Sequence, residues 1–133
     1  LILHKIDLTG IILKPNMILA GAQSSNKISN EEVSIKTLQC LKSSVPTEVP
    51  GIAFLSGGQS ELEAIKNLNL INQNNTTNFI MTYSYGRALQ QSALKFWSKD
   101  IKDIKGTQSI FNHTAKMCSL AAQGKWSSVL ENI

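Results

Sequence analysis

The sequence predicts an α/β fold in which parallel β-strands alternate with α-helices. Short apolar runs at 8–13, 52–55 and 79–83 are separated by longer stretches with helical periodicity, an order typical of parallel strands joined by helices. The run at 52–55 contains no polar residue, as expected of a strand covered on both faces. Three strand–helix units fit into 133 residues. The chain is therefore either part of a (β/α)8 barrel, which needs about 250 residues, or a small open sheet.

Each expected element follows from local signals. Ser29 with Glu32, and Ser60 with Glu63, predict capping boxes at the starts of the first two helices. In chain order we expect a strand at 8–13, a helix at 30–45, a strand at 52–55, a helix at 60–72, a strand at 79–83, a helix at 87–97, a helix at 100–123 and a tail without regular structure at 124–133. The last helix has an apolar stripe at three- and four-residue steps, formed by Ile101, Ile104, Phe111, Ala115, Cys118 and Ala122.

The composition fits one folded unit and disfavours several classes of protein. Hydrophobic residues make up 42% of the chain, and no apolar run reaches the roughly 18 residues of a membrane span. A signal peptide has a basic segment before its apolar residues, and no such segment precedes the apolar residues at the start of this sequence. Cys40 and Cys118 fit no metal or redox spacing, so both are expected to be buried thiols in a reducing cytoplasm.

The net charge of the chain is +4, and all of its basic residues but one are lysines. Twelve of the thirteen basic residues are lysines spread along the chain, and Arg87 is the single arginine. Aromatic residues make up only 6% and form no basic aromatic patch, which disfavours a nucleic-acid-binding domain. A lone Arg in a lysine-rich chain suggests a bidentate contact with phosphate or carboxylate.

Candidate functional residues follow each predicted strand, where ligands bind in parallel α/β folds. Lys14 follows the first strand, Ser56-Gly57-Gly58 the second, and Ser84 and Arg87 the third. The glycine pair before a capped helix either cradles a phosphate with backbone N–H groups or is only a tight turn. Arg87 at the next strand favours the phosphate.

Lys14 is a candidate nucleophile. It directly follows three aliphatic residues, and desolvation at such a strand end would lower the pKa of its amine. A neutral amine attacks carbonyl groups to form Schiff bases. The alternative is a lysine whose amine reaches from the strand end into water.

Several of these stretches together resemble class I fructose-bisphosphate aldolases. The stretches occur in the family's order and spacing, and they are LKPNM (13–17), FLSGGQSE (54–61), YSYGRALQ (83–90), SALK (92–95) and AAQGK (121–125). The resemblance implies that residues 1–133 form the C-terminal part of a (β/α)8 TIM barrel. Its last three strand–helix units would cover 8–97, its C-terminal helix 100–123 and its tail 124–133.

The resemblance also implies a function. The family is a cofactor-independent cytoplasmic lyase of glycolysis, a homo-tetramer at full length, that cleaves fructose 1,6-bisphosphate into dihydroxyacetone phosphate and glyceraldehyde 3-phosphate. Lys14 matches the Schiff-base lysine. The positions that match phosphate-binding residues are Ser56, Gly57, Gly58, Ser84 and Arg87. No metal, nucleic acid or membrane is expected as a partner.

The acid/base carboxylates of the family lie on earlier strands, which would precede Leu1. We therefore expect either a lyase fragment, inactive alone, or a truncated relic that acts as a binding or assembly module. A partial barrel would also leave apolar side chains of its interior without partners. The candidates are Ile11, Leu13, Phe54, Leu55, Ile80 and Tyr83.

Overall fold

Three parallel strands form the centre of the molecule. The structure, a computed structural model that describes residues 2–132, contains β1 (Ile12–Leu13), β2 (Gly51–Phe54) and β3 (Ile80–Tyr83) in the spatial order β1-β2-β3. Leu13 pairs with Ile52, and Ile52 pairs with Met81. The predicted α/β fold with a parallel sheet is confirmed.

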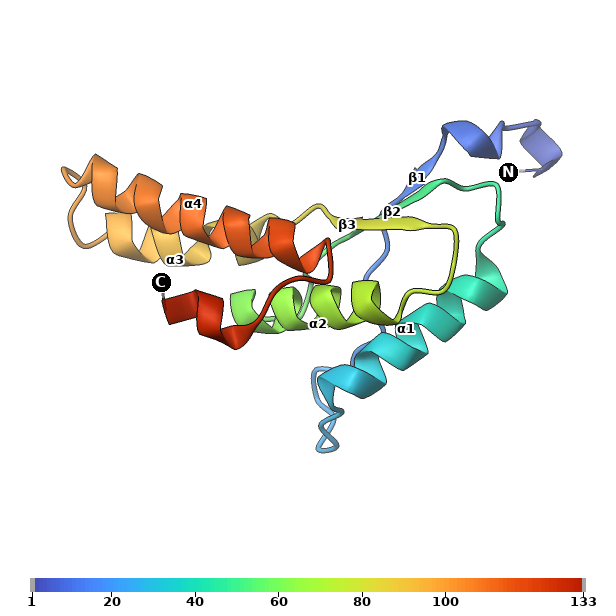
Figure 1. Cartoon of the computed structure of the whole chain (residues 1–133), viewed down its shortest axis with the longest axis horizontal. Coiled ribbons are helices and arrows are strands. Elements are labelled where there is room, and N and C mark those ends of the chain that lie inside the picture. The colour runs from blue at the N-terminus through green and yellow to red at the C-terminus, as the bar shows by residue number, and fades with distance from the viewer. Residues whose placement is uncertain (1, 133) are drawn as a thin grey trace.

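Four helices accompany the sheet: α1 (Asn30–Ser44), α2 (Glu61–Asn74), α3 (Arg87–Trp97) and α4 (Ile104–Ala121). Figure 1 shows α1 and α2 on one side of the strands, whereas α3 and α4 lie side by side beyond the strand ends. Among the described residues, no helix is both long enough and apolar enough to cross a membrane.

The two faces of the sheet differ in burial. Ile52, Phe54 and Met81 are buried against the helices, whereas Ile12 is 71% exposed and Ile80 is 75% exposed on the other face. Side chains alternate between the faces of a strand, so these two sets cannot share one face. The exposure of Ile80 is consistent with the prediction that it faces the interior of a barrel of which this chain forms only a part.

For three other residues, the prediction that they face a barrel interior is wrong. Phe54 is fully buried, and Leu13 and Tyr83 pack against the same helix-covered core. The physical reason is the register, which pairs Leu13 with Ile52 and Phe54 with Tyr83. Residues paired in this way share a face, and this face is the one beneath the helices.

The first predicted strand is wrong over most of its length. Residues Leu8–Gly10 form a short 3-10 helix, and the strand itself is limited to Ile12–Leu13. The Asp7 carboxylate accepts hydrogen bonds from the backbone N–H and the hydroxyl of Thr9, at 3.0 and 2.7 Å. These bonds lower the pKa of Asp7 and fix a turn where the apolar pattern predicted a strand.

The last helix is shorter than predicted, because Asp103 caps it. The Asp103 carboxylate accepts a hydrogen bond from Gly106 N–H at 2.9 Å, and the helix starts at Ile104. Ile101 and Ile104 are exposed rather than part of a buried stripe. Within the helix the buried side chains are those of Thr114, Met117, Cys118 and Ala121.

Two further expectations change at the periphery. Cys118 is buried, and burial raises the pKa of its thiol to about 12. Cys40 is exposed, so the expectation of two buried thiols is wrong for it. The tail contains a 3-10 helix at Ser128–Asn132, and the Trp126 indole donates a hydrogen bond to Glu131 at 2.7 Å.

Candidate active site

The three strands end at one edge of the sheet, and their hydrogen bonding continues past the strand ends. The Leu55 N–H donates to the Pro15 carbonyl at 3.0 Å, and the Ser84 N–H donates to the Phe54 carbonyl at 2.8 Å. The segments that follow the strands therefore lie side by side. Lys14, which precedes Pro15, is located at this edge.

A glycine turn follows β2. The Gln59 N–H donates to the Ser56 carbonyl at 3.1 Å and closes the turn. Gly58 has φ of +78°, a left-handed conformation that side chains disfavour. A Cβ added to Gly57 would lie 3.0 Å from the Leu55 side chain. The backbone therefore requires glycine at position 58, whereas a side chain at position 57 would need the Leu55 side chain to shift.

The turn leads directly into α2 through a complete capping box, which confirms the prediction for Ser60 and Glu63. The Ser60 N–H donates to the Glu63 carboxylate at 2.8 Å, and the Ser60 hydroxyl accepts from the Glu63 N–H at 3.3 Å. Hydrogen bonds from the Ser60 backbone, and then from its side chain, lower the pKa of Glu63. This box fixes the direction in which the chain leaves the turn.

Arg87 begins α3 and faces the same turn across a pocket. The preceding residue, Gly86, provides no side-chain cap for the helix, so the first backbone N–H groups lack that partner. Ser56, Gly58 and Arg87 line one pocket of about 530 Å³. Its other lining residues are Gln59, Gln91 and Leu94. The sequence predicted these three phosphate contacts in the segments after two different strands, and in the structure the three residues line one pocket.

The other predicted residues lie near this pocket without lining it. Lys14 and Ser84 are both exposed at the strand ends, and Gly57 lies within the turn. The desolvation expected for Lys14 is not found in this chain. The reason is that β1 has two residues and, within the described part of the chain, a single neighbouring strand, which leaves Lys14 exposed.

Sequence reasoning missed Asn16. Its side-chain amide donates to the Gly57 carbonyl at 3.3 Å, which ties the segment after β1 to the glycine turn. Its position two residues after Lys14 was the available signal, but an exposed Asn beside a Pro is also common in simple turns.

The carboxylates at the start of α2 already have partners. Glu61 accepts from the hydroxyls of Ser92 and Thr114, each at 2.8 Å, and so links α2 to α3 and α4. Glu63 is held in the capping box. Within residues 2–132, no group of three or more His, Cys, Asp and Glu residues is arranged to hold a metal ion.

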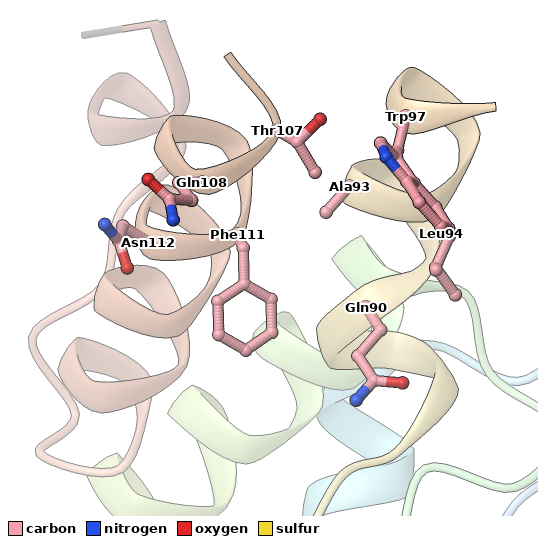
Figure 2. Close-up of a pocket in the computed structure, with 8 residues that line it drawn as sticks. All are labelled: Gln90, Ala93, Leu94, Trp97, Thr107, Gln108, Phe111 and Asn112. Atoms are coloured by element: carbon pink, nitrogen blue, oxygen red, sulfur yellow. The ribbon is translucent and has the colours of Figure 1, made fainter. Parts of the chain in front are cut away.

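A second pocket of about 630 Å³ lies between α3 and α4 (Figure 2). Phe111 and Thr107 of α4 face Ala93 and Gln90 of α3 across it. None of its eight lining residues is charged. Electrostatics therefore favour the pocket that contains Arg87 as the site for an anion.

Comparison with known proteins gives the family. A family model described as "Fructose-bisphosphate aldolase class-I" matches residues 1–132. The chain belongs to the class-I fructose-bisphosphate aldolase family. This confirms the resemblance found in the sequence motifs.

Class-I aldolases from distant organisms match nearly the whole chain. A "Probable fructose-bisphosphate aldolase class 1" of Xylella fastidiosa is 44% identical over 124 residues, which cover 92% of this chain and 37% of that relative. "Fructose-bisphosphate aldolase A" of Salmo salar is 47% identical over 124 residues, which cover 92% of this chain and 34% of that relative. The chain thus spans about a third of the length of these curated aldolases.

A solved aldolase structure has the same local fold. It is a ternary co-crystal structure of fructose-bisphosphate aldolase from Plasmodium falciparum in complex with TRAP and a small molecule inhibitor. The TM-score is 0.88 at 40% sequence identity, covering 93% of this chain and 36% of that aldolase. The parallel sheet and its helices are therefore an arrangement shared with that aldolase.

Proposed function

We propose that the chain supplies the Schiff-base lysine and one phosphate site of an enzyme that reversibly cleaves fructose 1,6-bisphosphate. The products are dihydroxyacetone phosphate and glyceraldehyde 3-phosphate, and the reaction belongs to glycolysis. The observation that carries the proposal is the pocket shared by Ser56, Gly58 and Arg87, at the sheet edge where the Lys14 segment ends. Membership of the class-I aldolase family supports the choice of reaction.

In this proposal Lys14 is the covalent residue. Its neutral amine attacks the ketone carbon of the sugar, and loss of water gives an iminium ion. The iminium accepts the electron pair of the breaking carbon–carbon bond, while a base takes the proton of the hydroxyl group on the leaving carbon. Glu61 and Glu63 already hold structural hydrogen bonds, so we assign the base to residues outside this chain.

The phosphate contacts follow from the chemistry of the pocket. Arg87 can make a bidentate contact with phosphate, and the hydroxyls of Ser56 and Ser84 can donate further hydrogen bonds. The backbone N–H groups of Gly57 and Gly58 and the uncapped start of α3 add partial positive charge. Together these groups would anchor one phosphate beside the lysine.

We further propose that the active form contains a complete (β/α)8 barrel. The units over 8–97, the helix within 100–123 and the tail 124–133 would then be its C-terminal part. We also propose that this form is a cytoplasmic homo-tetramer that needs no cofactor. The single neighbour of β1 and of β3 and the exposed Ile12 and Ile80 support completion of the sheet by further strands.

Trapping of the Schiff base tests the assignment of Lys14. The chain is incubated with dihydroxyacetone phosphate, reduced with borohydride and mapped by peptide mass spectrometry. We expect the adduct at Lys14, because a phosphate held by Arg87 would bring the ketone close to that amine. Arg87→Ala should lower the yield at Lys14, and Lys14→Met should abolish it. Labelling spread evenly over the exposed lysines would contradict the assignment.

A second candidate is a non-catalytic module that binds phosphosugars or assembles with a complete aldolase. The exposed face around Ile12 and Ile80 favours it, because that face would be covered by a complementary polypeptide. Size-exclusion chromatography of the chain mixed with a full-length class-I aldolase tests this candidate. Co-elution without turnover by the 133-residue chain supports it, whereas turnover by the pure chain excludes it.

A further inference from the structure

A chain of side-chain amides leads from the start of α1 to the glycine turn. Asn67, on α2, is 2% exposed and is the middle member of this row of hydrogen-bonded amides. Its Nδ2 donates to Gln59 Oε1 at 2.8 Å, and its Oδ1 accepts from Asn30 Nδ2 at 2.6 Å. Two helices thereby reach the loop that carries the candidate phosphate site.

Gln59 depends on this contact for its position. Within residues 2–132, its Nε2 is the one buried side-chain nitrogen or oxygen without a hydrogen-bond partner. Among the described residues, the bond from Asn67 is thus the only hydrogen bond that the Gln59 side chain makes. The Gln59 backbone closes the turn on Ser56 at 3.1 Å. Fixing the Gln59 side chain therefore fixes the end of the turn.

Gly58 and Gln59 separate two cavities. One is the pocket of about 530 Å³ that contains Arg87. The other, of about 220 Å³, is lined by Asn30 and Asn67 as well as by Gly58 and Gln59. Asn67 does not line the Arg87 pocket, and its hydrogen bond to Gln59 is the bond by which it reaches a residue that does.

We propose that Asn67 is a positioning residue for the phosphate-binding turn, which it holds in shape through Gln59. The inference rests on the proposed function, because it assumes that Ser56, Gly58 and Arg87 bind phosphate. It adds a role for a buried amide that does not itself contact the ligand. Without the Asn67 amide, the Gln59 side chain loses its hydrogen bond and can move. The lining of the Arg87 pocket beside Gly58 is then no longer fixed.

Asn69 provides a matched control on the same helix. It is 5% exposed, and its Oδ1 accepts a hydrogen bond from the Trp126 backbone N–H at 3.0 Å. Asn67→Ala and Asn69→Ala each remove one buried amide from α2, and we expect similar losses of thermal stability. Only the first variant removes a contact with the turn.

Hydrogen exchange tests the role without any ligand. The Gln59 amide proton should exchange roughly threefold to tenfold faster in Asn67→Ala than in the parent chain, as expected for the loss of one neutral hydrogen bond. Asn69→Ala should leave that exchange rate unchanged. Equal rates in the two variants would overturn the proposal. If Asn67→Ala does not fold, Asn30→Ala weakens the same chain of amides from its half-exposed end.

Binding of fructose 1,6-bisphosphate, measured by calorimetry, tests the consequence for the site. We expect Asn67→Ala to bind roughly threefold to tenfold more weakly and Asn69→Ala to bind as the parent does. The double variant Gln59→Ala/Asn67→Ala should bind no more weakly than Gln59→Ala alone, because the two residues act in series. Additive losses would overturn the proposal.

The Arg87→Ala variant separates this inference from the proposed function. If it binds as well as the parent, the phosphate site is wrong, and hydrogen exchange still decides the role of Asn67. If Arg87→Ala weakens binding while Asn67→Ala and Asn69→Ala behave alike, only the positioning role fails.

Discussion

Arg87 is the residue on which the proposed phosphate site most depends. It is the only arginine among thirteen basic residues, and it lines the pocket opposite Ser56 and Gly58. The planar guanidinium matches two phosphate oxygens at once, whereas a lysine ammonium acts as a point charge. In the proposed site, the one arginine of the chain would thus stand where bidentate geometry matters.

Removing this side chain gives the first prediction at the residue scale. Arg87→Ala should weaken binding of fructose 1,6-bisphosphate by roughly 10–150-fold, because a charged hydrogen bond contributes about 1.5–3 kcal/mol. Arg87→Lys should recover only part of the loss. Lys95→Ala, which removes an exposed cation from the same helix, is the control for net charge. Equal losses from Arg87→Ala and Lys95→Ala, measured by calorimetry, would contradict a specific contact.

The sequence predicted some site residues and not others for a physical reason. Ser56, Gly58 and Arg87 lie in or just after the segments that follow two strands, so local pattern alone places them at one edge. The contacts of Asn16 with Gly57 and of Asn30 with Asn67 join residues 41 and 37 positions apart. Polar residues in helices and turns are abundant, and only the folded chain shows which of their amides meet.

At the scale of the elements, local side-chain bonding decided where predictions succeeded. The capping box at Ser60 formed, and α3 has the predicted bounds. At Ser29 the hydroxyl accepts from the Glu32 N–H at 3.1 Å, but the Glu32 carboxylate pairs with Lys36 at 2.9 Å. Asp7 caps a short 3-10 helix and Asp103 caps α4, each within an apolar pattern. Single capping bonds of this kind override periodicity at the ends of elements.

The capping box gives a prediction for stability and its pH dependence. Ser60→Ala should lower the free energy of unfolding by about 0.5–2 kcal/mol, the usual contribution of an N-cap. The folded chain holds the pKa of Glu63 below its ordinary value of 4.5. This stabilisation is therefore complete above that value and is lost as the pH falls through the lower pKa of the folded state.

Urea unfolding between pH 7 and pH 3, followed by circular dichroism, measures both effects. Glu63→Gln should flatten the loss of stability with acid relative to the parent chain. Glu31→Gln, a change in an exposed acid of α1, is the control. An unchanged acid slope in Glu63→Gln would show that the capping carboxylate does not contribute.

For the whole molecule, the sheet decides how the chain behaves alone. Its helix-covered face contains Ile52 and Phe54, both fully buried, whereas its other face presents Ile12 and Ile80 to solvent. Unpaired strand edges and exposed apolar side chains favour association with other chains. The open face also lies beside the strand ends that carry Lys14, so one covering layer would both bury the sheet and desolvate the lysine.

We therefore predict that the 133-residue chain self-associates and shows no cleavage of fructose 1,6-bisphosphate above background. Covering each exposed isoleucine is worth about 1.5–3 kcal/mol, a large part of a total stability of about 5–15 kcal/mol. Ile12→Thr/Ile80→Thr should shift the chain toward monomer in sedimentation experiments and keep its helical circular dichroism. Ile52→Thr makes the same chemical change at a fully buried position and should unfold the chain instead. A monomeric parent chain with a sharp thermal transition would refute the role of the open face. Turnover by that pure chain would show that it contains its own base, and Asp7→Asn and Glu61→Gln would then be the first variants to assay.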